Sequence, residues 1–121
     1  MMLHYATLRV SDLERSAAFY DAILAPLGWR RQDASADGVS WGLNRPEFFV
    51  VRDSGAKPGF GMISFPAKSI PAVKASHESG VESGGTSAAE PGSPPAYGAG
   101  NYACRLEDPD GYTVEICVAH N

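Results

Sequence analysis

The feature that most constrains the fold is a hairpin signal near the end of the chain, in Tyr102–Val118 (YACRLEDPDGYTVEICV). Two stretches with alternating apolar residues flank the tetrapeptide DPDG at 108–111. Proline at the second turn position fixes φ, and glycine at the fourth can adopt the left-handed conformation that a tight reversal needs. The second arm, Thr113–Val118, is predicted to be a strand with Glu115 on one face, between apolar and β-branched residues.

Two hairpin registers remain open for this carboxylate. A two-residue loop pairs Glu115 with Cys104 and leaves the carboxylate without a partner. A type I turn followed by a glycine bulge pairs Glu115 with Arg105, and such a cross-strand ion pair contributes roughly 0.2–1 kcal/mol. Neither register places Cys104 opposite Cys117, so we expect two free thiols in a reducing compartment.

The first half of the chain predicts one helix among four strands. Ser11 or Asp12 can cap a helix over 12–25, whose apolar residues recur at helical spacing until Pro26 and Gly28 end it. The strands are expected at residues 3–10, 29–33, 38–43 and 47–52. The predicted order is therefore β-α-β-β-β.

The second half repeats the beginning of this order after a flexible joint at 54–59 (SGAKPG). A strand is expected at 60–66, a weaker helix at 70–79, and a Pro-, Gly- and Ser-rich loop at 86–100 before the hairpin. This internal repeat indicates a single α+β domain over 1–121, made of a first module at about 1–53 and a second at about 60–121.

Three stretches carry a resemblance to a known family: HYATLRVSDLERSAAFYDAILAPLGW, MISFPAKSIPAVKASHESGVESGG and YACRLEDPDGYTVEI. Together they resemble the glyoxalase, bleomycin resistance and extradiol dioxygenase superfamily, which has the vicinal oxygen chelate fold. The resemblance implies two tandem β-α-β-β-β modules that form a curled mixed sheet around one cleft. We expect the two sheets to face each other across this cleft with the helices outside.

The resemblance also implies a divalent metal site built from the first and last strands of each module. Its ligands fall on His4 and Glu115, and the carboxylate of Glu115 would also shuttle a proton. Met62 stands where the family usually has histidine. Phe49 matches a position that sometimes carries glutamate, and Glu47, two residues upstream, is a weaker candidate. Zn, Ni, Co, Mn or Fe would bind weakly, because a thioether replaces an imidazole.

The same residues permit plainer interpretations. His4 is also consistent with an ordinary half-exposed strand histidine, and Glu115 with a structural ion pair. A set of residues expected to line the substrate pocket comprises Trp41, Phe49, Met62, Tyr97 and Tyr102. Aromatic residues on strands are, however, more often part of the core.

Three functions therefore compete. The first is a metal-dependent lyase, isomerase or dioxygenase of the glyoxalase type. The second is a metal-free protein that binds or sequesters a small molecule, as resistance proteins of this superfamily do. The third is a degenerate module whose role is association.

Composition excludes several other classes of function. The net charge of −4 and the scattered basic residues argue against nucleic-acid binding, and the glycine pairs lack the context of a nucleotide loop. No apolar run approaches the length of a membrane span, and the missing leader pattern predicts a cytoplasmic protein.

Because the sheets leave edges to cover and the core is modest, we expect a homodimer, as dimers in the superfamily often complete their sites across chains.

Overall fold

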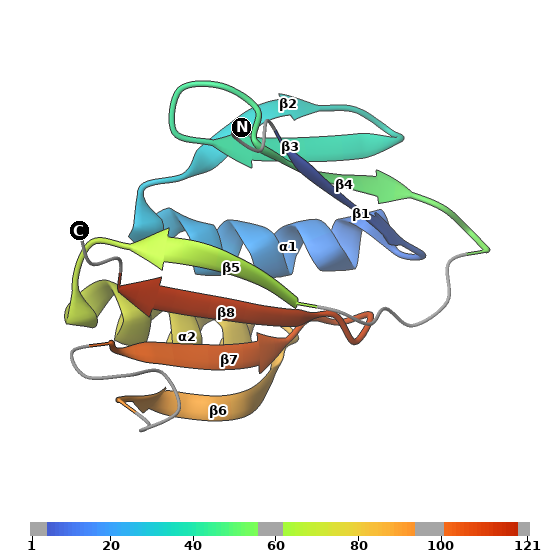
Figure 1. The fold of residues 1–121 in the computed structure, drawn as a ribbon. Helices are drawn as coiled ribbons and strands as arrows, with labels where there is room; N and C mark the ends of the chain where they lie inside the picture. Colours follow the sequence, from blue (N-terminus) through green and yellow to red (C-terminus); the bar gives the residue numbers. More distant parts are fainter. Residues whose placement is uncertain (1–4, 56–61, 94–100, 119–121) are drawn as a thin grey trace.

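The computed structural model describes residues 5–55, 62–93 and 101–118, which form two modules of four strands and one α-helix each (Figure 1). The first module contains β1 (Ala6–Val10), α1 (Leu13–Leu24), a short 3-10 helix η1 (Ala25–Leu27), β2 (Arg30–Ala34), β3 (Gly38–Gly42) and β4 (Phe48–Arg52). The second contains β5 (Met62–Ala67), α2 (Ile70–Glu82), β6 (Thr86–Gly92), β7 (Ala103–Glu107) and β8 (Thr113–Val118).

The two sheets have the same topology. Their strand orders are β1-β4-β3-β2 and β5-β8-β7-β6, and in each sheet the first strand of the module pairs in parallel with the last. The remaining pairs are antiparallel. The prediction of two tandem β-α-β-β-β modules in an α+β fold is therefore confirmed.

Helix α1 begins and ends at the expected signals. Of the two candidate caps, it is the Asp12 side chain that accepts a hydrogen bond, from the Arg15 backbone N–H at 3.1 Å. Gly28 follows η1 with φ of 85°, a left-handed conformation that favours glycine. Between these ends, the apolar face of α1 is fully buried.

The prediction of a loop over 86–100 is wrong for its first half, because Thr86–Gly92 forms strand β6. Its sequence, TSAAEPG, is poor in the β-branched and aromatic residues that mark strands. The strand lies at the edge of its sheet, with two register shifts against β7, and Pro91 is tolerated there because an edge strand has no ladder on one side. Pairing with β7, rather than local propensity, makes this segment a strand.

The closing hairpin adopts the second of the two registers left open by the sequence. Arg105 pairs with Glu115, and Gly111 takes φ of 95° after the turn, with its N–H donating to the Asp108 carbonyl at 3.0 Å.

Cys104 and Cys117 are free, as expected. Burial raises the pKa of the Cys104 thiol to about 11, which keeps this residue protonated and unreactive.

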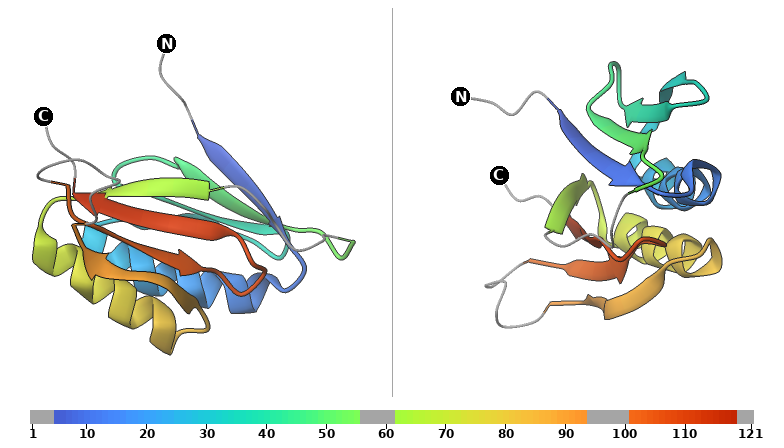
Figure 2. Two further views of the ribbon diagram at one scale, coloured as in Figure 1. Left: turned by 60° about the horizontal axis from the view of Figure 1, so that its bottom comes forward. Right: turned by 90° about the vertical axis from the view of Figure 1, so that its right-hand side faces the viewer.

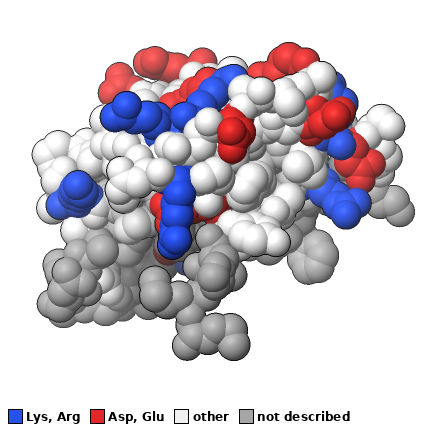
Figure 3. Space-filling model, turned by 90° about the horizontal axis from the view of Figure 1, so that it is seen from above, with Lys and Arg blue, Asp and Glu red and all other residues white. Residues whose placement is uncertain are grey.

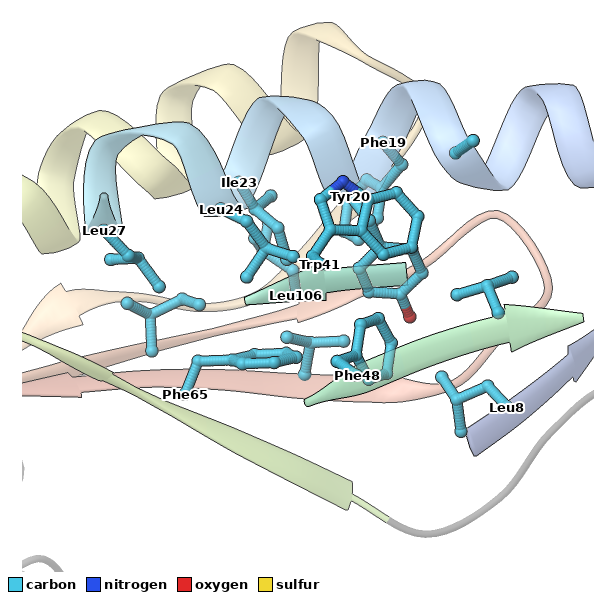
Figure 4. Close-up of a cluster of buried hydrophobic side chains, with 14 of the residues drawn as sticks. Leu8, Phe19, Tyr20, Ile23, Leu24, Leu27, Trp41, Phe48, Phe65 and Leu106 are labelled. Atoms are coloured by element: carbon cyan, nitrogen blue, oxygen red, sulfur yellow. The ribbon is translucent and has the colours of Figure 1, made fainter. Parts of the chain in front are cut away.

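The modules pack through the helix-covered faces of their sheets. One continuous core joins them, in which Phe48 of β4 and Phe65 of β5 meet edge to face with ring centroids 5.1 Å apart (Figure 4). The two helices also touch directly, since Ser76 of α2 donates to the Ile23 carbonyl of α1 at 2.8 Å. The sheets do face each other, but the helices lie in the wedge between them rather than outside (Figure 2).

A second connection between the modules is polar and buried. Asp108, at the hairpin turn, is 4% exposed and accepts the Tyr20 hydroxyl of α1 at 2.5 Å. Its other oxygen accepts the backbone N–H groups of Asp110 and Tyr112, each at 2.9 Å. Burial raises the pKa of Asp108 and also that of the Tyr20 phenol. Next to the Tyr20–Asp108 pair, the Asp110 carboxylate accepts a hydrogen bond from the Arg15 guanidinium at 2.7 Å.

Replacing Tyr20 with phenylalanine should lower the free energy of unfolding by about 1–3 kcal/mol, because it removes a donor from a buried carboxylate. Chemical denaturation measures this change. Tyr112→Phe serves as the matched control, since the Tyr112 hydroxyl donates to the Arg9 carbonyl at an exposed position and its loss should cost less. Equal effects of the two substitutions would show that the buried bond carries no special weight.

Candidate functional site

Each sheet has a second face that no helix covers. Because side chains alternate along a strand, the residues between the buried positions point to this helix-free face. In the first sheet the helix-free face contains Thr7, Asp33, Ser40, Phe49 and Val51. In the second it contains Met62, Ser64, Arg105, Glu115 and Cys117. Since the helix-covered faces meet in the core, the two helix-free faces point away from each other (Figure 2).

Glu115 is the polar centre of the helix-free face of the second sheet. Its Oε1 accepts the Ser64 hydroxyl at 2.9 Å, and its Oε2 accepts the Arg105 Nε–H at 3.3 Å. The side chain is only 12% exposed, against 36% for Arg105. Both carboxylate oxygens thus already have hydrogen-bond partners within this sheet.

The strand registers relate the two modules residue by residue. In the first module Thr7 of β1 lies beside Phe49 of β4, and in the second Ser64 of β5 lies beside Glu115 of β8. Phe49 is therefore the counterpart of Glu115. Two residues before Thr7 and Ser64 in the chain, Tyr5, which directly precedes β1, is the counterpart of Met62, and both are exposed. Tyr5 also contacts Phe49, with ring centroids 5.5 Å apart.

The structure separates the residues predicted to form the site. Phe49 and Met62 lie on helix-free faces, whereas Trp41 is 1% exposed in the core and Tyr102 packs against the core. The Trp41 indole N–H donates to Asp21 at 2.9 Å, in keeping with a structural role.

His4 and Tyr97 lie outside the described residues, so their assignments stay predictions. Glu47 precedes β4 and lines a crevice between the modules.

The described donor set does not fit a divalent metal ion. The four related positions carry a phenol, a phenyl ring, a thioether and a carboxylate held by an arginine, at Tyr5, Phe49, Met62 and Glu115. First-row divalent ions prefer imidazole and carboxylate ligands held together with open coordination positions. Within residues 5–55, 62–93 and 101–118, no group of three or more His, Cys, Asp or Glu side chains is placed to hold a metal ion.

The first sheet offers a hollow instead. A cavity of about 270 Å³ opens on its helix-free face, with Phe49 and Val51 as apolar lining and Asp33 and Asp37 as charged lining. Ser35 and Asp37 of the lining come from the turn between β2 and β3. From the sequence, this segment was expected only to connect two strands. The alternation of Phe49 and Val51 with buried residues in β4 is the signal that could have identified this apolar surface.

The face seen from the side of the first sheet carries charge of both signs. On it, basic and acidic side chains are interspersed, and uncharged surface lies between them (Figure 3). This face therefore lacks the clustered positive charge that a nucleic-acid interface needs. No helix among the described segments is long and apolar enough to cross a bilayer.

Comparison with known proteins finds one family model and several relatives. The model of the Glyoxalase/Bleomycin resistance protein/Dioxygenase superfamily matches residues 2–116. The uncharacterized protein YqjT of Bacillus subtilis (strain 168) is 30% identical, over 94% of this chain and 96% of its own.

Solved structures agree with this match. A glyoxalase/bleomycin resistance protein from Albidiferax ferrireducens superposes with a TM-score of 0.84 at 28% identity, over 99% of this chain and 100% of its own. The fosfomycin resistance protein FosX from Mesorhizobium loti, at 16% identity and a TM-score of 0.70, covers 98% of this chain and 92% of its own. At that identity the second likeness is evidence of the fold alone.

Met62→His should raise the affinity for nickel, cobalt or zinc by well over tenfold, more than about 1.4 kcal/mol, because it adds an imidazole on the face of Glu115. Calorimetric titration of the wild type and the variant measures the change. Ile70→His, at an exposed position on α2, controls for adventitious binding by a surface histidine. Equal affinities of the wild type and Met62→His would show that Met62 does not occupy a vacant ligand position.

Proposed function

Because the chain belongs to the glyoxalase/bleomycin resistance protein/dioxygenase superfamily, we propose that it binds a small organic molecule on its helix-free faces without a divalent metal ion. The ligand would rest on apolar and aromatic side chains, chiefly Phe49, Val51 and Met62. The Arg105–Glu115 pair would supply hydrogen-bonding groups at the same site.

The single observation that carries this proposal is the state of Glu115. Its carboxylate is the metal-ligand candidate best supported by the family resemblance, yet Ser64 and Arg105 already bind both of its oxygens. A metal ion would have to displace the arginine or share the carboxylate with it, and a nearby cation opposes binding of a second one. The counterpart positions Tyr5, Phe49 and Met62 add no imidazole or carboxylate.

A complete pocket on this plan needs a second chain. Within one chain the two helix-free faces point away from each other, so a ligand on one face cannot reach the other. A two-fold homodimer that places the first sheet of one chain opposite the second sheet of its partner would enclose two equivalent sites. The exposed Tyr5 and Met62 side chains and the hollow above Phe49 would then be buried.

A metal-dependent lyase, isomerase or dioxygenase is the second candidate. Glu115 favours it, because a largely buried carboxylate at this strand position can move a proton. In that case His4 would join Glu115, with Glu47 as a further candidate, and Zn, Ni, Co, Mn or Fe would be the cofactor. Elemental analysis of protein purified without chelator or added metal separates the two functions. Metal bound in a one-to-one ratio after dialysis would favour the enzyme.

A thermal-shift screen of small aromatic and amphipathic molecules should yield ligands that stabilise the protein equally with and without EDTA. Phe49→Ala should abolish most of this stabilisation, because it removes the apolar surface of the hollow. Leu43→Ala, at an exposed position outside the hollow, is the matched control. Stabilisation that disappears with EDTA would contradict metal-independent binding.

Light scattering at micromolar protein concentration should give twice the mass of one chain. Phe49→Asp should shift the protein toward the monomer, because it places a charge within the apolar surface that the partner would cover. Val81→Asp, on the exposed side of α2, should leave the mass unchanged. A monomer for the wild type would remove the shared pocket from the proposal.

A further inference from the structure

A crevice between the two modules lies apart from the hollow above Phe49. It has a volume of about 140 Å³ and is bounded by the start of β1, the start of β4, Trp29 between η1 and β2, and β5. A cavity of about 150 Å³ lined by apolar side chains is known to accept benzene, so the crevice has room for a small organic group. Of the residues expected from the sequence to bind substrate, the four that the structure describes, Trp41, Phe49, Met62 and Tyr102, do not line it.

Aromatic side chains form much of the lining. Tyr5 and Trp29 come from the first module beside Phe48, and Phe65 comes from the second. Phe65 lies edge to face with both Trp29 and Phe48, at ring-centroid distances of 5.6 and 5.1 Å. Figure 4 shows Phe48 and Phe65 approaching each other from opposite sheets. The rings therefore hold one another in fixed orientations at the base of the crevice.

The polar groups of the lining favour a positive ligand. Glu47 contributes a carboxylate, and no cationic side chain within the described residues lies within 4.0 Å of it. Ser64 contributes a hydroxyl that donates its proton to Glu115 at 2.9 Å, so this group can act toward a ligand only as an acceptor. Among the described residues, no lysine or arginine lines the crevice.

We propose that this crevice binds a methylated ammonium cation, of the kind found in choline. The accessible rings of Tyr5 and Trp29, over a base formed by the buried Phe48 and Phe65 and with one carboxylate beside them, are the chemistry that recognises quaternary ammonium groups, because aromatic rings attract a cation that cannot donate hydrogen bonds. A trimethylammonium group contains fewer heavy atoms than benzene and fits the available volume.

This site does not depend on the ligand proposed for the helix-free faces. The crevice is formed largely by side chains of the inter-module core, such as Phe48 and Phe65, whereas Phe49 and Glu115 do not line it. Loss of binding at one site would leave the other measurable. Ser64 and Tyr5 belong to both, since each lines the crevice while Ser64 donates to Glu115 and Tyr5 contacts Phe49.

The test compares choline with 3,3-dimethylbutan-1-ol, a neutral molecule of nearly the same shape, by NMR titration of the isotope-labelled protein. Choline should bind at least tenfold more tightly and shift the indole N–H signal of Trp29. The indole of Trp41, buried in the core and bonded to Asp21, is the internal reference and should not move. Phosphatidylcholine vesicles are added to the choline complex in a separate arm.

Glu47→Gln should weaken choline binding at least fivefold and leave binding of the neutral alcohol unchanged. Glu78→Gln, which removes an exposed carboxylate on α2, should change neither. Trp29→Leu should weaken both ligands. Equal binding of choline and the alcohol, or an unmoved Trp29 signal, would overturn the proposal. Displacement of choline by the vesicles would support the same recognition with a lipid headgroup as its source, and no displacement would support a free cation.

Discussion

The structure depends on the packing of the two helix-covered sheet faces into one core. Phe48 and Phe65 join the sheets, α1 and α2 touch between them, and the buried Tyr20–Asp108 hydrogen bond connects the first helix to the last hairpin turn. A module of this size is only marginally stable by itself, so the shared core matters for both. Because this packing uses the helix-covered faces, it leaves the helix-free faces directed outward, and these faces become the surfaces available for ligands.

The outward direction of these faces explains why the functional proposals divide into two. A ligand shared by both faces requires a second chain, since the faces of one chain cannot meet. The inter-module crevice requires no partner, because both of its walls belong to one chain. Ser64 lies between the two, with its hydroxyl bonded to Glu115. Charge also distinguishes them, since Arg105 lies on the second helix-free face whereas the crevice offers Glu47.

Much of the fold was predictable, because strong local signals agree with the tertiary structure. The Asp12 cap, the Gly28 stop and the turn before Gly111 all lie where the sequence indicated. Strand β6 was not predictable, because its pairing with β7 overrides a sequence of low β-propensity. The prediction that the helices lie outside the two sheets was wrong, since an amphipathic pattern shows which side of a helix is buried but not which module covers it.

The candidate site was less predictable, because it depends on strand parity. A shift of one residue moves a side chain to the opposite face, and the register makes Tyr5 the counterpart of Met62. Trp41 is a similar case, since only the pairing of β3 with β4 shows that it faces the core. The Arg105–Glu115 pairing, by contrast, was one of two registers that the turn chemistry allowed.

Titration with paramagnetic Co²⁺, followed in NMR spectra of the wild-type protein, tests the metal-free account of the site most directly. The account predicts that stoichiometric Co²⁺ leaves the backbone signals of β8 around Glu115 sharp, because that carboxylate is held by Ser64 and Arg105. Selective broadening of the β8 signals together with those of the first residues of β1 and β5, at one equivalent of Co²⁺, would contradict it.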